Sequence, residues 1–183
     1  MEKIYSFEFE GDDLYGGTRD GKLIHINILT GKTKMISLAT TFPGIRNIYY
    51  TGILKDKICF GGTPYLIRAN RDLSEVNFIS LTDAEGRQHT DILCGHILED
   101  KNELWLGTIT GGVFVFTVSD SLIFKKQLYK NTNTENAMTS NGVLDMMRSR
   151  DKMYLCMEAG INIIDVNTNR IISIQKKNGL PDD

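Results

Sequence analysis

The segment Leu104-Trp-Leu-Gly-Thr108 has two close copies elsewhere in the chain. These copies are Leu14-Tyr-Gly-Gly-Thr18 and Cys59-Phe-Gly-Gly-Thr63, and the three threonines follow one another at intervals of 45 residues. A fourth copy, Met153-Tyr-Leu-Cys-Met157, has lost the Gly-Thr pair. A repeat of this period indicates that one supersecondary unit is used several times.

The surroundings of the four copies also match. Each copy follows an apolar strand that ends in a charged turn, and each precedes a third strand, a polar hairpin and a fourth strand. Residues 139–150 are the best helical candidate, but the repeat assigns them to a strand as well. Four strands in about 45 residues are typical of a β-propeller blade, whereas a β-sandwich has no such fixed period. We therefore predict an all-β protein of four four-stranded antiparallel blades.

The repeat also predicts how the chain is divided. The expected blades cover residues 1–40, 41–85, 86–135 and 136–178 of a single propeller region, and residues 178–183 look like the start of a next repeat. Four blades can close as a small ring or form an arc of a larger one, and we expect a part of a larger propeller. An open arc exposes apolar blade faces, so self-association into a homo-oligomer is expected.

Small and aromatic residues recur with the repeat. The chain has 17 glycines and only 3 prolines. Gly17, Gly62 and Gly107 lie inside the second strands, where a missing side chain allows close approach of a neighbouring blade or backbone. Aromatic residues also recur beside them, and we interpret them as packing residues between blades: Tyr15, Phe60, Trp105 and Tyr154.

Composition excludes several classes of protein. The 183 residues are 41% hydrophobic and 24% charged, with a formal net charge of −2. Neither a nucleic-acid partner nor insertion of this segment into a membrane is expected, since there is no basic excess and no apolar run of the roughly 20 residues that span a bilayer. The N-terminal residues have no signal-peptide pattern. The three cysteines, far apart and odd in number, predict no disulfide framework.

Asp100-Lys-Asn-Glu-Leu-Trp-Leu-Gly-Thr-Ile-Thr-Gly-Gly-Val113 resembles the two-component regulator propeller repeat. Asn178-Gly-Leu-Pro-Asp182 is similar to the opening of the next such repeat. The resemblance covers all four units, with the third nearest to the family pattern and the fourth furthest from it. It implies the extracytoplasmic, periplasmic sensor region of a hybrid two-component sensor kinase, in which these propellers recognise carbohydrate-type ligands and signal to a histidine kinase.

Two other functions remain open at this point. A generic propeller scaffold for protein interactions would have the same repeats. A propeller lyase or glycosidase would need clustered acid and base residues, and the sequence offers no such cluster. We therefore expect this segment to be non-catalytic, with no cofactor.

Short motifs that mimic known sites are better explained as turns. Residues 16–22 match the start of a phosphate-binding loop, but Leu23 replaces the Ser or Thr and a strand follows in place of a helix. Residues 165–176 mimic a calcium loop but have Arg170 where glycine belongs. The three histidines show no metal-ligand spacing, so no metal is expected.

A ligand surface is expected on one rim of the propeller. The loops before the innermost strand and between the second and third strands of each blade meet there. Sugar recognition combines an aromatic platform with a few polar groups. The candidate ligand-binding residues on these loops are Arg46, Tyr65, Arg87, His89 and Asp91.

Overall fold

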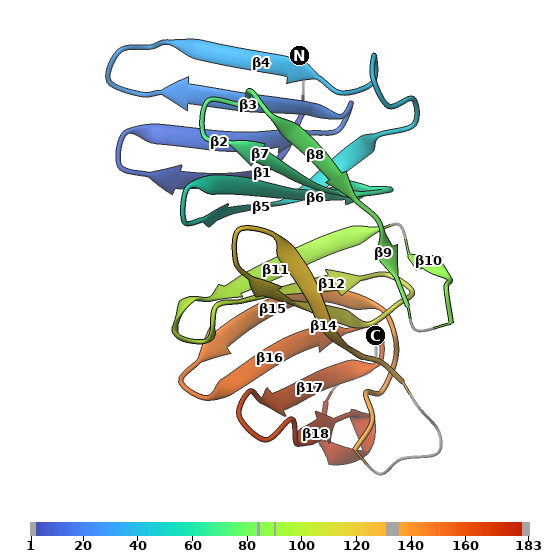
Figure 1. Ribbon diagram of the computed structural model, residues 1–183. Coiled ribbons are helices and arrows are strands. Elements are labelled where there is room, and N and C mark those ends of the chain that lie inside the picture. Colours follow the sequence, from blue (N-terminus) through green and yellow to red (C-terminus); the bar gives the residue numbers. More distant parts are fainter. Residues whose placement is uncertain (1–2, 84, 90, 131–135, 181–183) are drawn as a thin grey trace. The chain divides into compact units, whose positions relative to one another are not determined.

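The computed structural model describes residues 3–83, 85–89, 91–130 and 136–180. Four antiparallel sheets of four strands follow one another along the chain, and within each sheet the strand order is the chain order (Figure 1). This arrangement confirms the predicted all-β fold of four-stranded blades. Residues 139–150 do contain a strand, as the repeat required.

The strand bounds are as follows. Sheet 1 contains β1 (Ile4–Glu10), β2 (Asp13–Thr18), β3 (Lys22–Asn27) and β4 (Thr33–Ser37). Sheet 2 contains β5 (Arg46–Leu54), β6 (Lys57–Thr63), β7 (Leu66–Asn70) and β8 (Val76–Ile79). Sheet 3 contains β11 (Ile92–Leu98), β12 (Glu103–Thr108), β13 (Val113–Val118) and β14 (Leu122–Leu128). Sheet 4 contains β15 (Val143–Ser149), β16 (Lys152–Met157), β17 (Gly160–Asp165) and β18 (Ile171–Ile174).

A few short elements lie outside the four sheets. A two-stranded sheet, β9 (Leu81–Thr82) with β10 (Gln88–His89), was not anticipated. Single 3₁₀ turns occur as η1 (Glu99–Lys101) and η2 (Lys176–Asn178). The tail predicted to begin a next repeat lies partly outside the described residues, which end at 180. Among the described residues, no helix is long and apolar enough to cross a membrane.

The chain divides into two compact units, Met1–Gly95 and His96–Asp183. The division falls inside β11. The first unit therefore contains sheets 1 and 2, and the second contains sheet 4 and most of sheet 3.

The core of the first unit lies between sheets 1 and 2. Alternating residues of each strand point into this layer, as the two-residue period of a strand requires. Sheet 1 contributes Tyr15 and Leu23, and sheet 2 contributes Ile58, Phe60 and Ile67, all at most 2% exposed. Burial of such side chains stabilises a fold by about 1.5–3 kcal/mol each, so this layer holds the unit together.

The glycine prediction holds at Gly17 and at Gly62, but the two glycines meet different neighbours. A Cβ atom on Gly17 would lie 2.1 Å from the Cγ2 atom of Ile48 in sheet 2. In sheet 2 the matching close approach occurs at Gly61, whose Cβ would lie 2.5 Å from the Cγ2 atom of Ile92. Gly62 instead faces the backbone of β5 in its own sheet, with the Arg46 carbonyl oxygen at 3.2 Å.

Phe60 packs between sheets as predicted, but it does not occupy the same strand position as the other aromatic residues. Tyr15, Trp105 and Tyr154 are each the third residue of a second strand, but the third residue of β6 is Cys59. Phe60 is the fourth residue, so it points to the opposite face and packs into the core against sheet 1. β6 has seven residues where β2, β12 and β16 have six. The alignment on threonine is therefore one residue out of step with the structure in sheet 2.

Candidate ligand-binding rim

In each sheet the first strand begins, the second ends and the third begins along one edge, which we call the rim. The pairing of Arg46 with Thr63 and of Gly61 with Leu66 places these residues at the rim of sheet 2. Within the rim of sheet 1, Arg19 N–H donates to the Lys3 carbonyl oxygen at 3.0 Å, and Asn47 N–H of sheet 2 donates to the Arg19 carbonyl oxygen at 2.8 Å, which joins the two rims. The rim of this unit is thus a connected backbone surface.

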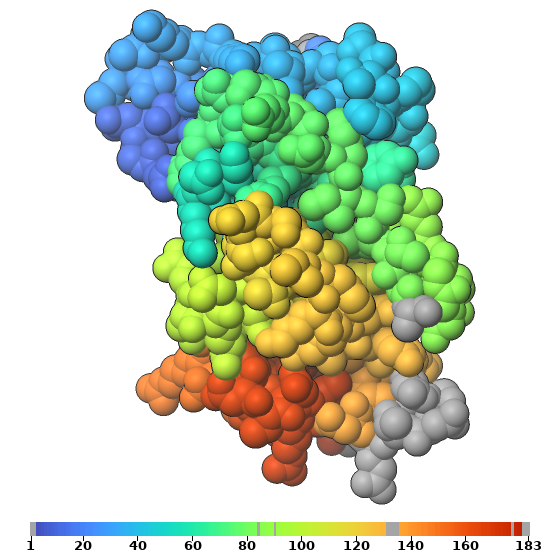
Figure 2. Space-filling model, in the orientation of Figure 1, coloured from blue at the N-terminus to red at the C-terminus, as the bar shows by residue number. Residues whose placement is uncertain are grey.

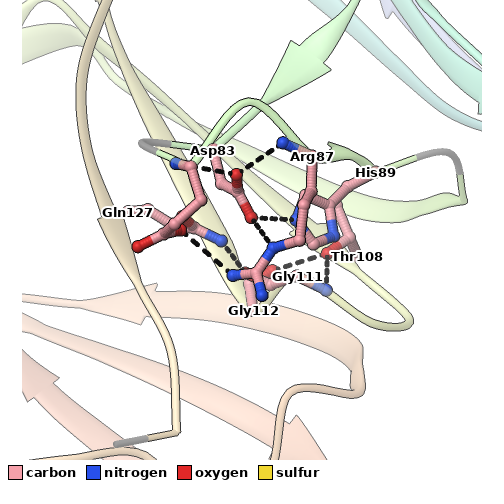
Figure 3. A network of polar contacts seen from close by, with 8 residues as sticks. Asp83, Arg87, His89, Thr108, Gly111, Gly112 and Gln127 are labelled. Carbon is pink, nitrogen blue, oxygen red and sulfur yellow. Dashed lines mark hydrogen bonds and ion pairs between the residues drawn. The ribbon is translucent and has the colours of Figure 1, made fainter.

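The repeated threonine fixes the turns on the rim. The Oγ1 atom of Thr18 accepts the backbone N–H of Lys22 at 3.0 Å. In sheet 3 the Oγ1 atom of Thr108 accepts the N–H of Gly111 at 2.9 Å and donates to the carbonyl oxygen of Gly112 at 3.0 Å (Figure 3). Both threonines are buried, at 1% and 0% exposure. A buried hydroxyl that satisfies turn backbone groups explains the recurrence of threonine.

Thr63 has a different partner from the other threonines. Its Oγ1 atom donates to the Oδ1 atom of Asp91 at 2.6 Å, and Asp91 lies directly before β11. Because Arg46 pairs with Thr63 across β5 and β6, two predicted site residues, Arg46 and Asp91, lie on either side of one threonine. Arg46 is exposed, so its guanidinium is available to an acidic or hydroxylated ligand.

Tyr65 belongs to an aromatic cluster. It lies between β6 and β7, half-buried, and its ring centroid is 5.9 Å from that of Phe78 and 6.3 Å from that of Phe42, both in edge-on geometry. The cluster packs against the core of the first unit. Tyr65 therefore has a structural role, which the prediction of a ligand-binding residue did not include.

Arg87 and His89 converge on Asp83, which was not among the predicted ligand-binding residues (Figure 3). The Oδ2 atom of Asp83 accepts the Nε–H of Arg87 at 2.8 Å and lies 3.0 Å from the Nε2 atom of His89. Its Oδ1 atom accepts the backbone N–H groups of Arg87 at 2.8 Å and of Glu85 at 3.1 Å. The Asp83 carboxylate is 1% exposed, whereas the Arg87 side chain is 69% exposed.

Asp83 and Arg87, in the loop between β9 and β10, stabilise each other's charged forms. Burial alone raises the pKa of Asp83, but hydrogen bonds from His89 and Arg87 outweigh burial and hold that pKa well below its ordinary value. Asp83 in turn raises the pKa of Arg87. Arg87 also bonds Glu85 through its Nη2 atom at 3.0 Å. The result is a guanidinium of fixed orientation at an exposed position, which suits recognition of hydroxyl or carboxylate groups.

The second unit has its own rim contacts. The Nε2 atom of Gln127 on β14 donates to the carbonyl oxygen of Gly111 at 2.7 Å (Figure 3). Gly112 N–H donates to the carbonyl oxygen of Asn141 at 2.9 Å, and this second bond holds the turn before β13 against the loop that enters β15. Among the described residues, no group of three or more His, Cys, Asp or Glu side chains is placed to hold a metal ion.

The five predicted residues thus fall into three local groups. Arg87 and His89 share Asp83, Arg46 and Asp91 flank Thr63, and Tyr65 lies in its aromatic cluster. Sequence reasoning missed Asp83 and Thr63, which organise the first two groups. For Asp83, the pattern of an aspartate followed three residues later by Gly86 was the available signal, since it is typical of a side chain that caps its own turn.

Comparison with known proteins bears on the fold. No family model matches the sequence, and no curated protein matches it. Solved structures do match. The extracellular domain of the putative hybrid two-component system BT4673 from B. thetaiotaomicron is 16% identical, with a TM-score of 0.69, over 100% of this chain and 22% of that one. The WD40 repeats of RRP9 are 10% identical, with a TM-score of 0.75, over 96% of this chain and 52% of that one.

A third similar structure is the dihydro-heme d1 dehydrogenase NirN in complex with DHE. It is 15% identical, with a TM-score of 0.74, over 94% of this chain and 37% of that one. The chain therefore spans about half or less of the length of each of these three proteins. At such low identity the likeness shows the fold alone: the sheets are β-propeller blades.

Proposed function

We propose that this chain is the ligand-recognition part of an extracytoplasmic, periplasmic sensor in a two-component regulatory system. In this proposal the chain is non-catalytic, binds a carbohydrate-type ligand on its rim, and passes the signal to a histidine kinase. The observation that carries the proposal is the likeness of the whole chain to part of a two-component extracellular domain. The resemblance of residues 100–113 to the two-component regulator propeller repeat supports it independently.

The chemistry of the rim agrees with a sugar ligand. Arg87 is held in one orientation by a buried carboxylate yet remains exposed, so it loses little side-chain entropy when it binds. Arg46 and Asp91 add a donor and an acceptor close to Thr63. Hydroxyl-rich ligands are recognised by such planar donors and acceptors beside an apolar surface.

The test is direct binding of oligosaccharides. The chain is screened against an array of neutral and uronic-acid oligosaccharides, and each hit is titrated by calorimetry. We expect a hit whose dissociation constant rises about tenfold or more in Arg87→Ala and in Arg46→Ala, because a charge-assisted hydrogen bond contributes about 1.5–3 kcal/mol. Arg170→Ala, an exposed arginine of the β17–β18 turn, is the matched control and leaves binding unchanged.

The signalling half of the proposal has its own test. Expression of a reporter gene in cells that carry the intact sensor measures the response to the ligand. Loss of response in Arg87→Ala with unchanged protein level supports the proposal. A full response from a sensor in which all five rim residues are alanine contradicts it.

A second candidate is a scaffold for protein interactions, which the likeness to the RRP9 WD40 repeats favours. The same array separates the two. A scaffold gives no oligosaccharide hit and no sensor response, and it retains a protein partner whose binding the rim substitutions weaken.

A further inference from the structure

One face of sheet 1 is apolar and exposed. Tyr15 and Leu23 face sheet 2, so strand alternation places their neighbours on the opposite face, which we call the β1 face. Strand pairing aligns the residues of this face in two rows across the sheet. The first row is Phe7, Gly16, Ile24 and Met35, and the second row is Phe9, Leu14, Ile26 and Thr33. Phe7 is 61% exposed, and Phe9 and Met35 are each 48% exposed.

Sheet 2 shows what covers this face in the repeat. Residues of the two sheets can be matched by counting from the turn between the first and second strands. The row of sheet 2 that matches Phe7 is Thr51, Phe60, Ile67 and Phe78. The row that matches Phe9 is Ile53, Ile58, Ala69 and Val76. These residues face sheet 1, and Ile58, Phe60, Ile67 and Ala69 are at most 1% exposed. The β1 face is therefore built like a surface that a preceding sheet covers.

Sheet 4 has the complementary surface, which we call the β18 face. Its central row is Met147, Tyr154, Ile163 and Ile172, and Met147 and Ile172 are 62% and 48% exposed. The matching row of sheet 1, which faces sheet 2, is Glu8, Tyr15, His25 and Lys34. Sheet 4 thus has three apolar residues where sheet 1 has charged or polar ones, although its face is exposed.

Within each unit a lysine bridges neighbouring sheets. In the first unit Lys34 donates to the carbonyl oxygen of Asp72 in the β7–β8 turn. In the second unit Lys126 bonds Asn169, and Lys101 Nζ donates to the Oδ1 atom of Asn167 at 2.6 Å, both acceptors being in the β17–β18 turn. The strands and turns that these lysines join lie side by side in the space-filling view (Figure 2).

At the exposed faces, the positions that correspond to the lysine and to the contacted turn residue both have apolar side chains. On β18 the position of Lys34 and Lys126 is taken by Ile172, which pairs with Ile163 as Lys34 pairs with His25. In the β3–β4 turn the position of Asp72 and Asn167 is taken by Leu29, which is 76% exposed. The lysine position and the turn position that contact each other between sheets 1 and 2 are thus both occupied by apolar side chains at the exposed faces, Ile172 and Leu29.

We propose that the β18 face of one copy of this chain packs against the β1 face of a second copy, head to tail, with Ile172 against Leu29. We choose a second copy as the partner because one chain carries both the β1 face and the β18 face. Each face corresponds in position to a surface that is buried between neighbouring sheets within the chain. The paired change at Ile172 and Leu29 favours contact between these two faces over contact of either face with itself. Such an interface is heterologous, so it joins unlike faces of identical chains.

Light scattering coupled to size-exclusion chromatography, over a wide range of concentration, tests the proposal. The unmodified chain is expected at twice its 20.6 kDa mass or more, and Phe7→Glu and Met147→Glu each at the monomer mass. A charge buried in an apolar contact raises the dissociation constant at least about tenfold. Leu29→Asp changes a side chain on an exposed turn, so it tests the joint without disturbing a core. Ile123→Lys, at a 56% exposed isoleucine of β14, is the matched control.

A mixing experiment distinguishes the head-to-tail joint from a symmetric one. Phe7→Glu retains a working β18 face and Met147→Glu retains a working β1 face, so an equimolar mixture is expected to form a dimer that neither variant forms alone. Circular dichroism verifies that each variant is folded. The proposal is overturned by a parent chain that stays monomeric, by a single variant that still associates with itself, or by a mixture that stays monomeric.

Discussion

Gly17 occupies a position where a single methyl group has no room. The Cβ atom of an alanine there would lie 2.1 Å and 2.5 Å from two side-chain atoms of Ile48. Ile48 is fully buried within the core of the first unit, so any shift it makes displaces packed neighbours. The glycine thus sets how closely β2 approaches β5.

We expect Gly17→Ala to destabilise the first unit by about 1–3 kcal/mol, because an added carbon in a packed interior forces backbone shifts. The midpoint of urea denaturation, followed by circular dichroism, measures this loss. Gly61→Ala, which meets Ile92 at 2.5 Å, should behave alike. A midpoint equal to that of the parent at both positions would show that the sheets separate easily.

His96 on β11 makes stability depend on pH near neutrality. Burial lowers its pKa, and the nearby Arg148 lowers it further. The unfolded chain therefore binds a proton at a higher pH than the folded chain does. Stability is expected to fall as pH drops from about 6.5, the ordinary histidine value, until the folded pKa is reached.

The measurement is the free energy of unfolding between pH 8 and pH 5. His96→Gln should show a shallower slope than the parent across this window. If the free energy of unfolding changed equally with pH in the two proteins, His96 would not be the cause of the pH dependence.

Single residues show the limit of sequence reasoning at the rim. Arg87 and His89 could be selected because exposed polar residues in a rim loop suggest ligands. Asp83, which joins them, looked like an ordinary turn residue, because its burial depends on the two-stranded sheet that the loop forms. Burial of a polar group is a tertiary property, and one side chain in a sequence does not reveal it.

At the scale of the elements, the turns between second and third strands depend on one hydroxyl. Thr108→Val keeps the shape of the side chain but leaves the N–H of Gly111 without its acceptor inside a buried turn. We expect a loss of about 1–3 kcal/mol, the usual effect of an unsatisfied buried donor. Thr41→Val, at an exposed loop position, should change stability by less than about 0.5 kcal/mol. Equal denaturation midpoints for the two variants would contradict this role.

The β17–β18 turn should make the protein sensitive to acid. The Lys152 side chain and the backbone N–H groups of Thr168 and Asn167 bond Asp165 and hold its pKa well below the ordinary value. Its contribution is fully present above the unfolded pKa of about 3.9 and is lost as pH falls towards the folded pKa. Asp165→Asn should therefore flatten the decline of stability below about pH 4. The free energy of unfolding of both proteins is measured from pH 5 to pH 2. The same decline in the variant as in the parent would refute this role of Asp165.

Strands and their order were predictable because alternation and turn residues are local signals. The register of sheet 2 was not. The three Gly-Thr pairs align without a gap, yet β6 has one residue more than β2, so Gly61 and Cys59 match Gly17 and Tyr15. Alignment on the identical Gly-Thr residues gave one register. The structure follows the other register, which is obtained by counting residues from the turn between the first and second strands. The short pair β9 and β10 was missed because two-residue strands have no period.

For the whole molecule, the division into two units predicts where a local defect is felt. In repeat proteins stability is largely a sum of unit and nearest-neighbour terms. Gly17→Ala should therefore speed amide hydrogen exchange within residues 3–83 and leave sheet 4 nearly as protected as in the parent. Exchange measured by mass spectrometry on peptides from both units tests this. Uniform acceleration through β15–β18 would indicate one cooperative molecule.

The blade architecture could be predicted from the repeat alone, since four matching segments require four matching environments. The function could not, because a propeller is a scaffold whose ligand depends on a few rim side chains. Arg46 and Asp91 are 45 residues apart in sequence, and only the pairing of β5 with β6 brings them to one threonine.

The extra residue of β6 has a practical consequence for recombining the repeats. A chimera that exchanges the second repeat for the third has to be joined in the turn between first and second strands, at Asp56 and Asn102, where the two repeats are in step. A crossover placed at the shared Gly-Thr instead adds or removes one residue of β6. Every side chain beyond the junction would then exchange its inner and outer positions. Crossover libraries built on sequence identity would accordingly be enriched in misfolded products, and libraries built on hairpin position would not.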